Sequence, residues 1–433
     1  MIITNFKNLA KNPLRKKALQ IVEAGYEAIS IEKTVKNKIK INKNKLSGPN
    51  FAIDLNKYRK VYILGIGKGS ALASAALAEI LDGRLTKGIA IDVSKLQAPS
   101  SKLQDFVGTH PFPSIQNIRA TGKIIELAEK AGKDDLVISF ICGGGSALLC
   151  ASEKELKASR EIFSKLTAAG ANIIELNTIR KHLSVIKGGG LAKIAYPATL
   201  ISLVVSDVFN GDLSMVASGP TIYDKTTKNN TIKILKKYFL NPKSYILNSI
   251  IETPKDKKYF KKIKNILFIS NREPIAAMAK KAKKLGFAPK IYSYNLEGEA
   301  KNALAPLTRL LSRVKVNKHS IVLAGGETTI KLGKNPGKGG RNMEAVLGVI
   351  SNLKSQISNL TVVSFASDGK DNVDAAGAIG DILTINKAGK LKLDCEKYLK
   401  NHSTLDFFKK TGDLIFTDQK TFNVSDLMLI LKS

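Results

Sequence analysis

Three apolar segments, each running into a loop and then a helix, limit the chain to a few architectures. The segments and their loops are residues 61–64 with Gly65-Ile66-Gly67-Lys68-Gly69, residues 136–140 with Gly143-Gly144-Gly145-Ser146, and residues 200–205 with Ser206-Asp207. Short, continuous apolar runs are typical of buried parallel strands, and the order strand, loop, helix is that of a βαβ unit. The first half of the chain is therefore predicted to form a Rossmann-like parallel sheet.

The loops of such a sheet lie together at the carboxyl ends of the strands, where α/β proteins bind their ligands. Three consecutive glycines lose much conformational freedom on ordering, so the run from Gly143 to Gly145 is more than a plain turn needs. Because Ser146 adds a hydroxyl to the backbone donors, this loop is predicted to bind an anion; a flexible connection is the alternative. The loop at residues 65–69 lacks P-loop spacing, and Ser70 replaces the third glycine of the dinucleotide fingerprint. A tight turn with a solvated lysine is an equally good interpretation of it.

A glycine-rich region in the second half of the chain also predicts anion binding. Gly337-Lys338-Gly339-Gly340-Arg341-Asn342 follows Ala324-Gly325-Gly326-Glu327-Thr328 closely and opens a helix predicted over residues 341–353. Glycines let the backbone approach a ligand, Arg341 offers a rigid fork of donors, and the helix start would point free N–H groups the same way. We expect phosphate or carboxylate to bind here.

The second half alternates strands and helices again, which predicts a second, smaller α/β domain. A Lys-rich stretch with two prolines, residues 241–264, is the predicted boundary. We assign residues 1–250 to a Rossmann-like nucleotide and substrate domain and residues 251–433 to the domain with the glycine–arginine loop. The remaining predicted elements are helices over 13–30, 274–285 and 298–314, strands over 266–270, 290–294, 321–324 and 361–366, and a loop over 35–50.

The formal net charge of +33 raises nucleic-acid binding as an alternative function. Of the 69 basic residues, however, 59 are Lys and 10 are Arg, and they are scattered along the chain. Base reading favours Arg, so we interpret the lysines as solvated surface. Three cysteines without metal-type spacing indicate a reducing compartment, and no apolar run has the length of a signal peptide or a membrane span. We therefore expect a cytoplasmic protein.

Several polar residues are weaker candidates for chemistry. Asp207 at a strand end would suit Mg²⁺, although an aspartate there more commonly caps a helix. Asn177, Arg180 and Ser184 share one helical face that would line a cleft; an exposed helix with a glycine C-cap is the alternative. Ser218-Gly219-Pro220-Thr221 is interpreted as a turn. His110, inside Thr109-His110-Pro111, is a candidate acid or base, although a single histidine beside proline is more commonly structural.

Taken together, the motifs resemble those of the glycerate 2-kinase family, some of whose members are labelled hydroxypyruvate reductase. The matching pieces of the first half are GIGKGSA from Gly65, THPFPS from Thr109, CGGGSALL from Cys142, LNTIRKHLSVIKGGGLA from Leu176, SDV from Ser206 and ASGPT from Ala217. Those of the second half are GGETT from Gly325, GKGGRNMEA from Gly337 and SDGKDNVDAAGA from Ser367. They follow the family's order over most of the chain.

The resemblance implies an ATP-dependent kinase with a large Rossmann-like domain, a smaller α/β domain and an interdomain cleft. It implies catalytic roles for Lys68 and Arg341 and a metal-side role for Asp207. The expected reaction transfers the γ-phosphoryl group of ATP to the 2-hydroxyl of D-glycerate, with Mg²⁺, giving 2-phosphoglycerate. Phosphate contacts are expected from Gly65, Gly67, Gly143, Gly144, Gly145, Ser146, Gly339, Gly340 and Asn342.

This chain departs from the family's pattern at Met343, at Asn372-Val373 and in residues 417–424, which leaves acceptor choice open. No general base is assigned. A reductase using NAD(P)H on hydroxypyruvate is the main alternative. It requires a dinucleotide fingerprint, which Ser70 breaks, and an acidic residue about 20 positions after it; Asp92 lies a little farther along. The expected partners are D-glycerate and ATP, with no specific nucleic acid and no membrane.

Overall fold

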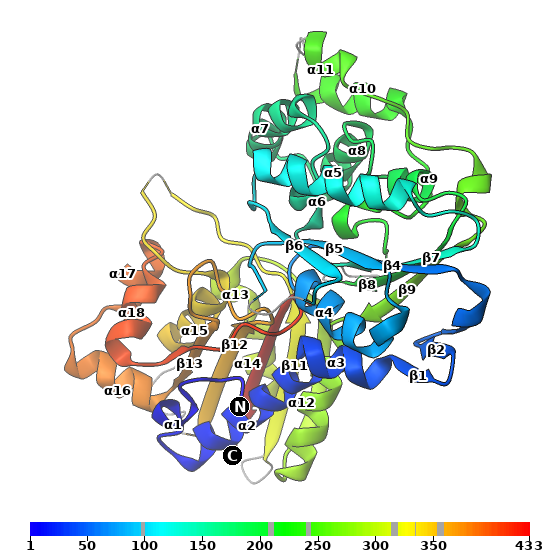
Figure 1. Ribbon diagram of the computed structural model, residues 1–433. Helices are drawn as coiled ribbons and strands as arrows, with labels where there is room; N and C mark the ends of the chain where they lie inside the picture. Colours follow the sequence, from blue (N-terminus) through cyan, green and yellow to red (C-terminus); the bar gives the residue numbers. More distant parts are fainter. Residues whose placement is uncertain (97–99, 207–211, 240–243, 313–318, 334, 353–358) are drawn as a thin grey trace. The chain divides into compact units, whose positions relative to one another are not determined.

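The computed structural model describes residues 1–433 except 97–99, 207–211, 240–243, 313–318, 334 and 353–358. The chain divides into two compact units (Figure 1). The parallel-sheet unit is Ile31–Phe268, and the mixed-sheet unit combines Met1–Ser30 with Ile269–Ser433. This division differs from the predicted one, because the N-terminal helix belongs with the second half of the chain. An amphipathic helix shows in its sequence that it needs an apolar partner, but not which sheet supplies it.

The parallel-sheet unit is built on six strands in the order β6-β5-β4-β7-β8-β9, and the pairings from β6 through to β8 are parallel. This confirms the predicted α/β fold. The strand order reverses at β4, which lies between β5 and β7, and such a switch point is where open α/β sheets bind ligands. The strands are β4 (Lys60–Ile66), β5 (Lys87–Asp92), β6 (Leu103–Val107), β7 (Asp135–Ile141), β8 (Thr199–Val205) and β9 (Ile263–Ile269).

Helices cover both faces of this sheet (Figure 1). α3 (Ile31–Lys38) and α4 (Ser70–Leu81) lie on one face, and α5 (Ile115–Glu129) and α9 (Gly190–Ile194) lie on the other. A separate apolar core joins four further helices, α7 (Glu153–Ala168), α8 (Ile173–His182), α10 (Lys228–Tyr238) and α11 (Ser244–Asn248). The short α6 (Gly145–Leu148) follows the three-glycine loop.

The loop predicted over residues 35–50 is wrong. Part of it belongs to α3, and the rest forms a three-stranded antiparallel sheet of β1 (Lys40–Asn42), β2 (Lys45–Gly48) and β3 (Phe51–Asp54). Most of these residues are exposed or half-buried, with Leu46 and Phe51 the buried ones. Backbone pairing, which leaves little trace in a Lys- and Asn-rich sequence, holds this sheet together.

The mixed-sheet unit has six strands in the order β10-β11-β15-β12-β13-β14. β10 and β11 are parallel, and the remaining pairs are antiparallel. The C-terminal strand β15 lies at the centre, between β11 and β12. The strands are β10 (Ala288–Leu296), β11 (Ser320–Gly326), β12 (Leu360–Ala366), β13 (Gly377–Asp381), β14 (Leu414–Ile415) and β15 (Asp426–Lys432).

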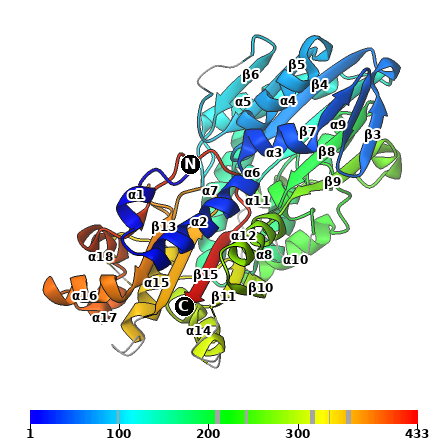
Figure 2. The ribbon, with the colours of Figure 1, turned by 90° about the horizontal axis from the view of Figure 1, so that it is seen from below.

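Helices also cover the mixed sheet. α2 (Pro13–Ala28) packs beside α12 (Arg272–Lys284), as Figure 2 shows. A second core contains α15 (Arg341–Asn352) and two short helices, α13 (Ala300–Ala303) and α14 (Ala305–Ser312), where the sequence predicted one helix. The other helices are α1 (Phe6–Leu9), α16 (Ile382–Lys390), α17 (Cys395–Lys400) and α18 (Thr404–Thr411). No helix in the described ranges combines the length and hydropathy needed to cross a membrane.

Candidate functional site

The glycine loops after β4 and β7 are bonded to each other at the switch point. The Cys142 N–H donates to the Ile66 carbonyl at 2.8 Å, and the Lys68 N–H donates to the Gly143 carbonyl at 2.9 Å. Gly67 has a φ of +107°, and a Cβ there would lie 2.4 Å from the Cys142 carbonyl oxygen. Glycine is therefore required at this position by the close approach of the two loops.

The loop after β7 presents a set of backbone donors. Within the residues that the structure describes, the N–H groups of Gly143, Gly144 and Ser146 donate no backbone hydrogen bond. Gly144 has a φ of +77°, and a Cβ there would lie 3.2 Å from Lys68 Cγ and 3.3 Å from His110 Cδ2. A cluster of N–H donors with a lysine beside it is a suitable site for a phosphate.

The N-terminus of α4, by contrast, is occupied by a side chain of the protein. Asp92, at the end of β5, accepts from the Ala71 N–H at 3.1 Å and from the Val93 N–H at 2.7 Å. The carboxylate is buried, and burial raises its pKa although backbone donors oppose the rise. In a dinucleotide fold the acidic residue near this position binds the ribose. Here it caps α4 instead.

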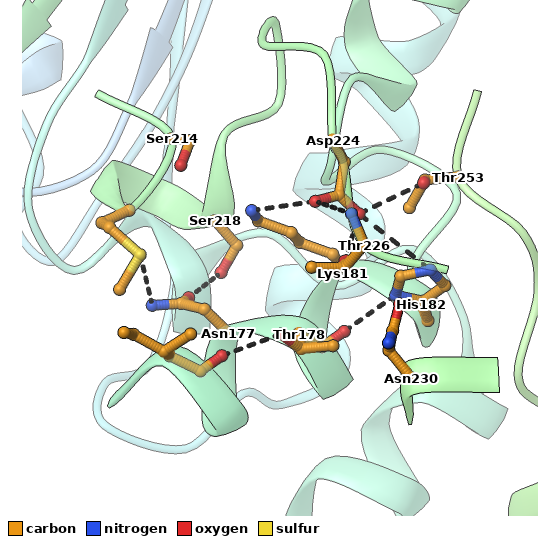
Figure 3. Close-up of polar contacts among 12 residues, drawn as sticks. Asn177, Thr178, Lys181, His182, Ser214, Ser218, Asp224, Thr226, Asn230 and Thr253 are labelled. Carbon is orange, nitrogen blue, oxygen red and sulfur yellow. Dashed lines mark hydrogen bonds and ion pairs between the residues drawn. The ribbon is translucent and has the colours of Figure 1, made fainter. Parts of the chain in front are cut away.

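A chain of three polar side chains connects the loop after β7 to α8. The hydroxyls of Ser146 and Ser218 are 2.8 Å apart, and Ser218 donates to Asn177 Oδ1 at 2.7 Å, a contact drawn in Figure 3. The face of α8 that carries Asn177 is buried, so the alternative of an exposed helix is wrong. The motif from Ser218 to Thr221, interpreted as a turn, has the additional role of joining these segments.

The backbone around Ser218 is strained and tightly held. Ala217 and Ser218 have φ values of 50° and 58°, a region that residues with a Cβ seldom adopt. The N–H of Gly188 donates to the Ser218 carbonyl at 2.9 Å, and that of Gly189 donates to the Gly219 carbonyl at 2.8 Å. The glycine run after α8 thus holds this turn in place and is not a helix C-cap.

Buried ion pairs fix α8 and its flanking segments. Lys181 Nζ lies 3.2 Å from Asp224 Oδ1, and Thr253 and Thr226 donate to the same carboxylate (Figure 3). Burial acts to raise the pKa of Asp224, but Lys181 and Thr226 lower it overall. Lys187 Nζ lies 2.6 Å from Glu155 Oε1. Sequence reasoning missed these pairs because their members come from segments far apart in the chain.

The metal prediction is not addressed by this structure. Asp207 lies outside the described residues, directly after Ser206 at the end of β8. In the described part of the chain, no group of three or more His, Cys, Asp or Glu side chains could hold a metal ion. A protein-only metal cage is therefore not found among these residues, whereas a Mg²⁺ ion held by substrate phosphates needs one or two carboxylates.

Arg341, in the mixed-sheet unit, lies between two carboxylates. Its Nε is 2.5 Å from Asp426 Oδ2, and its Nη1 contacts Glu327. Asp426 is buried, Glu327 is exposed, and the arginine side chain is 30% exposed. Burial opposes the charge of Arg341, but the two carboxylates raise its pKa overall. The guanidinium stays charged and keeps an exposed part.

The start of α15 differs from the prediction of free N–H groups. Asp371 accepts from the N–H groups of Asn342 at 3.2 Å and of Met343 at 3.0 Å. A Cβ on Gly340 would lie 2.1 Å from Asp371 Cγ, and one on Gly339 would lie 2.2 Å from Thr404 Oγ1. These glycines therefore permit internal packing, and an aspartate of the same unit takes the helix donors.

The carboxyls of Asp371 and Asp426 influence each other's titration. Burial, with a contribution from Asp426, raises the pKa of Asp371 to about 7, against the opposing effect of its N–H donors. Burial also raises the pKa of Asp426, although Arg341 acts in the other direction. Sequence reasoning noted Asp371 only as part of an acidic loop and missed Asp426, whose role depends on β15 being central.

Comparisons with known families match both halves of the chain. The family described as "Domain of unknown function (DUF4147)" matches residues 17–250, and the MOFRL family matches residues 320–426. The two matches leave residues 1–16, 251–319 and 427–433 uncovered.

Individual proteins are similar to almost the whole chain. The D-glycerate 2-kinase of Thermotoga maritima is 31% identical over 427 residues, which cover 96% of this chain and 98% of that protein. A putative hydroxypyruvate reductase of Agrobacterium vitis is 35% identical over 384 residues, 85% of this chain and 86% of that protein. The crystal structure of a Thermotoga maritima glycerate kinase aligns with a TM-score of 0.84 at 29% identity, over 96% of this chain and 99% of that one.

Proposed function

The chain belongs to the glycerate 2-kinase family, and from this premise we propose that it transfers the γ-phosphoryl group of ATP to the 2-hydroxyl of D-glycerate, giving 2-phosphoglycerate. Relatives over nearly its full length are named for this activity. The geometry of the parallel-sheet unit supports the proposal independently of those names.

The observation that carries the proposal is the loop after β7 at the switch point, residues 143–146, which we call the donor loop. The N–H groups of Gly143, Gly144 and Ser146 donate no backbone hydrogen bond among the described residues, and Lys68 lies beside Gly144. Phosphoryl transfer depends on positioning and on neutralising the charge of the moving group, with little covalent chemistry by the protein. Backbone donors and one lysine supply both requirements.

The proposed roles follow from these positions. Lys68 offsets charge on the transferred phosphoryl group, and residues 143–146 bind phosphate oxygens. Gly67 lets the two loops approach each other, which sets the position of Lys68, and Gly65 leaves room for Ser74 and Ala90. Arg341, in the other unit, offsets charge on the phosphoryl group or the substrate carboxylate. Gly339, Gly340 and Asn342 shape the Arg341 loop by packing and by bonding to Asp371.

Mg²⁺ is proposed to accompany ATP, with Asp207 as the carboxylate on the protein side. When bound, Mg²⁺ neutralises charge on the β- and γ-phosphates. The residues around the donor loop fit this arrangement. Their N–H groups and Lys68 would bind phosphate oxygens, and the other phosphate oxygens would hold the Mg²⁺ ion together with Asp207. We also propose that the protein acts in the cytoplasm, which its three free cysteines support.

The alternative function is NAD(P)H-dependent reduction of hydroxypyruvate, a name that some relatives carry. Two features of this chain argue against it. Ser70 stands where the dinucleotide fingerprint requires glycine, and its hydroxyl donates to the Ile91 carbonyl at 3.2 Å. Asp92 caps α4, so its carboxylate is engaged away from a ribose.

The test is to supply the purified enzyme with ATP, Mg²⁺ and D-glycerate, and in parallel with NAD(P)H and hydroxypyruvate. We expect ADP release that depends on D-glycerate, no NAD(P)H oxidation, and a product whose phosphorus resonance couples to the proton at carbon 2. Phosphorylation at carbon 3 would contradict the assigned position, and NAD(P)H oxidation without ADP release would establish the alternative. Binding to DNA should be sequence-blind and should weaken steeply with salt.

A further inference from the structure

Arg180 is a half-buried cation that lacks the carboxylate partner of the protein's buried cations. Within the described residues no carboxylate or carbonyl accepts a hydrogen bond from it, and its guanidinium lies 4.7 Å from the centre of the Phe163 ring. The paired cations are Arg15 with Asp381 and Asp413, Lys181 with Asp224, Lys187 with Glu155, and Arg341 with Asp426.

A buried charge without a counterion raises the free energy of the folded state. Burial also lowers the pKa of Arg180, the direction expected when its charge is poorly solvated. A guanidinium retained in such a place is stabilised when an anion binds beside it. The segments on either side of Arg180 indicate which anion can reach it.

The α8 side of Arg180 leads to the donor loop. Asn177 is three residues earlier on α8, so the two side chains leave the same face of the helix. Asn177 accepts from Ser218 (Figure 3), and Ser218 contacts Ser146 in the donor loop. The face of α8 that carries Asn177 and Arg180 is therefore connected to the proposed phosphate site through Ser218.

The α7 side of Arg180 leads to the same place. Phe163, under the guanidinium, is three residues after Arg160 on α7, and Arg160 donates to the Pro113 carbonyl at 3.2 Å. Pro113 closes the short segment that begins at His110, whose ring lies close to Gly144. The two helices that meet at the guanidinium, α7 and α8, thus each contact a segment that borders the donor loop.

We propose that Arg180 binds the carboxylate of the acceptor and holds its 2-hydroxyl toward the phosphates. This inference rests on the proposed function and extends it to a residue that determines acceptor specificity. The donor loop and Lys68 account for phosphate oxygens of ATP, and the carboxylate next to the reacting hydroxyl is the only charged group of D-glycerate. If Arg180 binds this carboxylate, the role left to Arg341 is to offset charge on the phosphoryl group. A planar guanidinium matches a carboxylate through two parallel hydrogen bonds, and stacking on an aromatic ring holds it in one orientation.

The test compares Arg180→Met with Arg119→Met, which removes an exposed arginine from α5 of the same unit. For Arg180→Met we expect the KM for D-glycerate to rise about 10- to 100-fold, because charge-assisted hydrogen bonds to its carboxylate are lost. The KM for ATP should stay within about twofold of the wild-type value. Arg119→Met should change neither. A rise in the KM for ATP alone would show that Arg180 binds nucleotide phosphate, and unchanged KM values for both substrates would show that it binds neither; either result overturns the inference.

A binding measurement separates this inference from the proposed function. D-glycerate alone should raise the Tm of the wild-type enzyme, and Arg180→Met should lose this shift while keeping the shift given by ATP. If the wild type releases no ADP but shows the D-glycerate shift and the variant loses it, only the proposed function has failed. If Arg180→Met does not fold, Arg180→Lys decides, because it keeps the charge without the fork. A selective rise in its KM for D-glycerate supports the inference, and equal changes in both KM values contradict it.

Discussion

Ser146 and Ser218 are 72 residues apart in the chain, yet their hydroxyl oxygens lie 2.8 Å apart. Because the single proton of Ser218 is directed at Asn177 Oδ1, Ser146 must donate to Ser218. The contact links the donor loop after β7 to the strained turn before Gly219. Polar contacts as well as apolar packing therefore set the geometry of this edge of the sheet.

Replacing Ser218 with alanine should damage the donor loop more than the fold. The variant leaves Asn177 Oδ1 without a donor and Ser146 without an acceptor, which we expect to cost about 1–3 kcal/mol of stability. Because the loop is no longer held, the KM for ATP should also rise. Denaturant unfolding and steady-state kinetics measure the two effects separately.

Ser139→Ala is the matched control for Ser218→Ala. Ser139 and Ser202 form another buried hydroxyl pair at 2.8 Å, between β7 and β8, within the sheet. Its loss should destabilise the protein to a similar extent and leave the KM for ATP unchanged. An equal rise in KM for both variants would show that the kinetic effect reflects general destabilisation.

Gly144→Ala tests whether the donor loop has to be open. Its φ of +77° makes alanine cost about 1–2 kcal/mol, and the new methyl group would lie against Lys68 and His110. We expect the KM for ATP to rise about tenfold or more, equivalent to about 1.4 kcal/mol or more of binding. Gly170→Ala is the control, because φ there is +80° and a Cβ meets nothing within 4 Å. A similar kinetic loss in both variants would contradict a phosphate site at Gly144.

The parallel-sheet architecture could be predicted because its signals are local. Apolar runs, glycine loops and helix periodicity each occupy about ten residues, and the rule that strand ends share an edge brings residues 65–69 and 143–146 together. The structure has these loops bonded to each other. The predicted helices over 13–30 and 341–353 are present as α2 and α15 with small changes at their ends.

The mixed-sheet unit was less predictable because its polar contacts join distant segments. Asp371 caps α15 from 29 residues downstream of Asn342, and Asp426 reaches Arg341 from 85 residues away. A glycine-rich loop before a helix looks the same in sequence whether its N–H groups face a ligand or an aspartate. Only the fold shows which of these applies, because it places Asp371, in the segment after β12, at the start of α15.

Lys68→Ala and Arg341→Ala should both lower kcat, and the second should also clearly destabilise the protein. Removing Arg341 leaves Asp426 buried without its cation, an arrangement that costs about 3–5 kcal/mol. Arg341→Lys keeps the charge, so it should recover much of the stability but little of the activity if a planar fork is needed. Kinetics measured at a temperature where circular dichroism shows every variant folded will distinguish these effects. Full activity in both alanine variants would refute the assigned roles.

The mixed-sheet unit should lose stability as the pH rises from about 4 to about 7, and Asp371 should be one cause. Its folded pKa of about 7 lies above the ordinary value of 3.8, so in this interval the folded state keeps a proton that the unfolded chain releases. The contribution is complete below pH 4 and is lost as the pH passes 7, with a slope of up to about 1.4 kcal/mol per pH unit. Asp371→Asn should flatten the pH dependence of unfolding measured in urea. Asp374→Asn removes an exposed carboxylate three residues away and should leave it unchanged; equal slopes for wild type and Asp371→Asn would exclude Asp371 as the source.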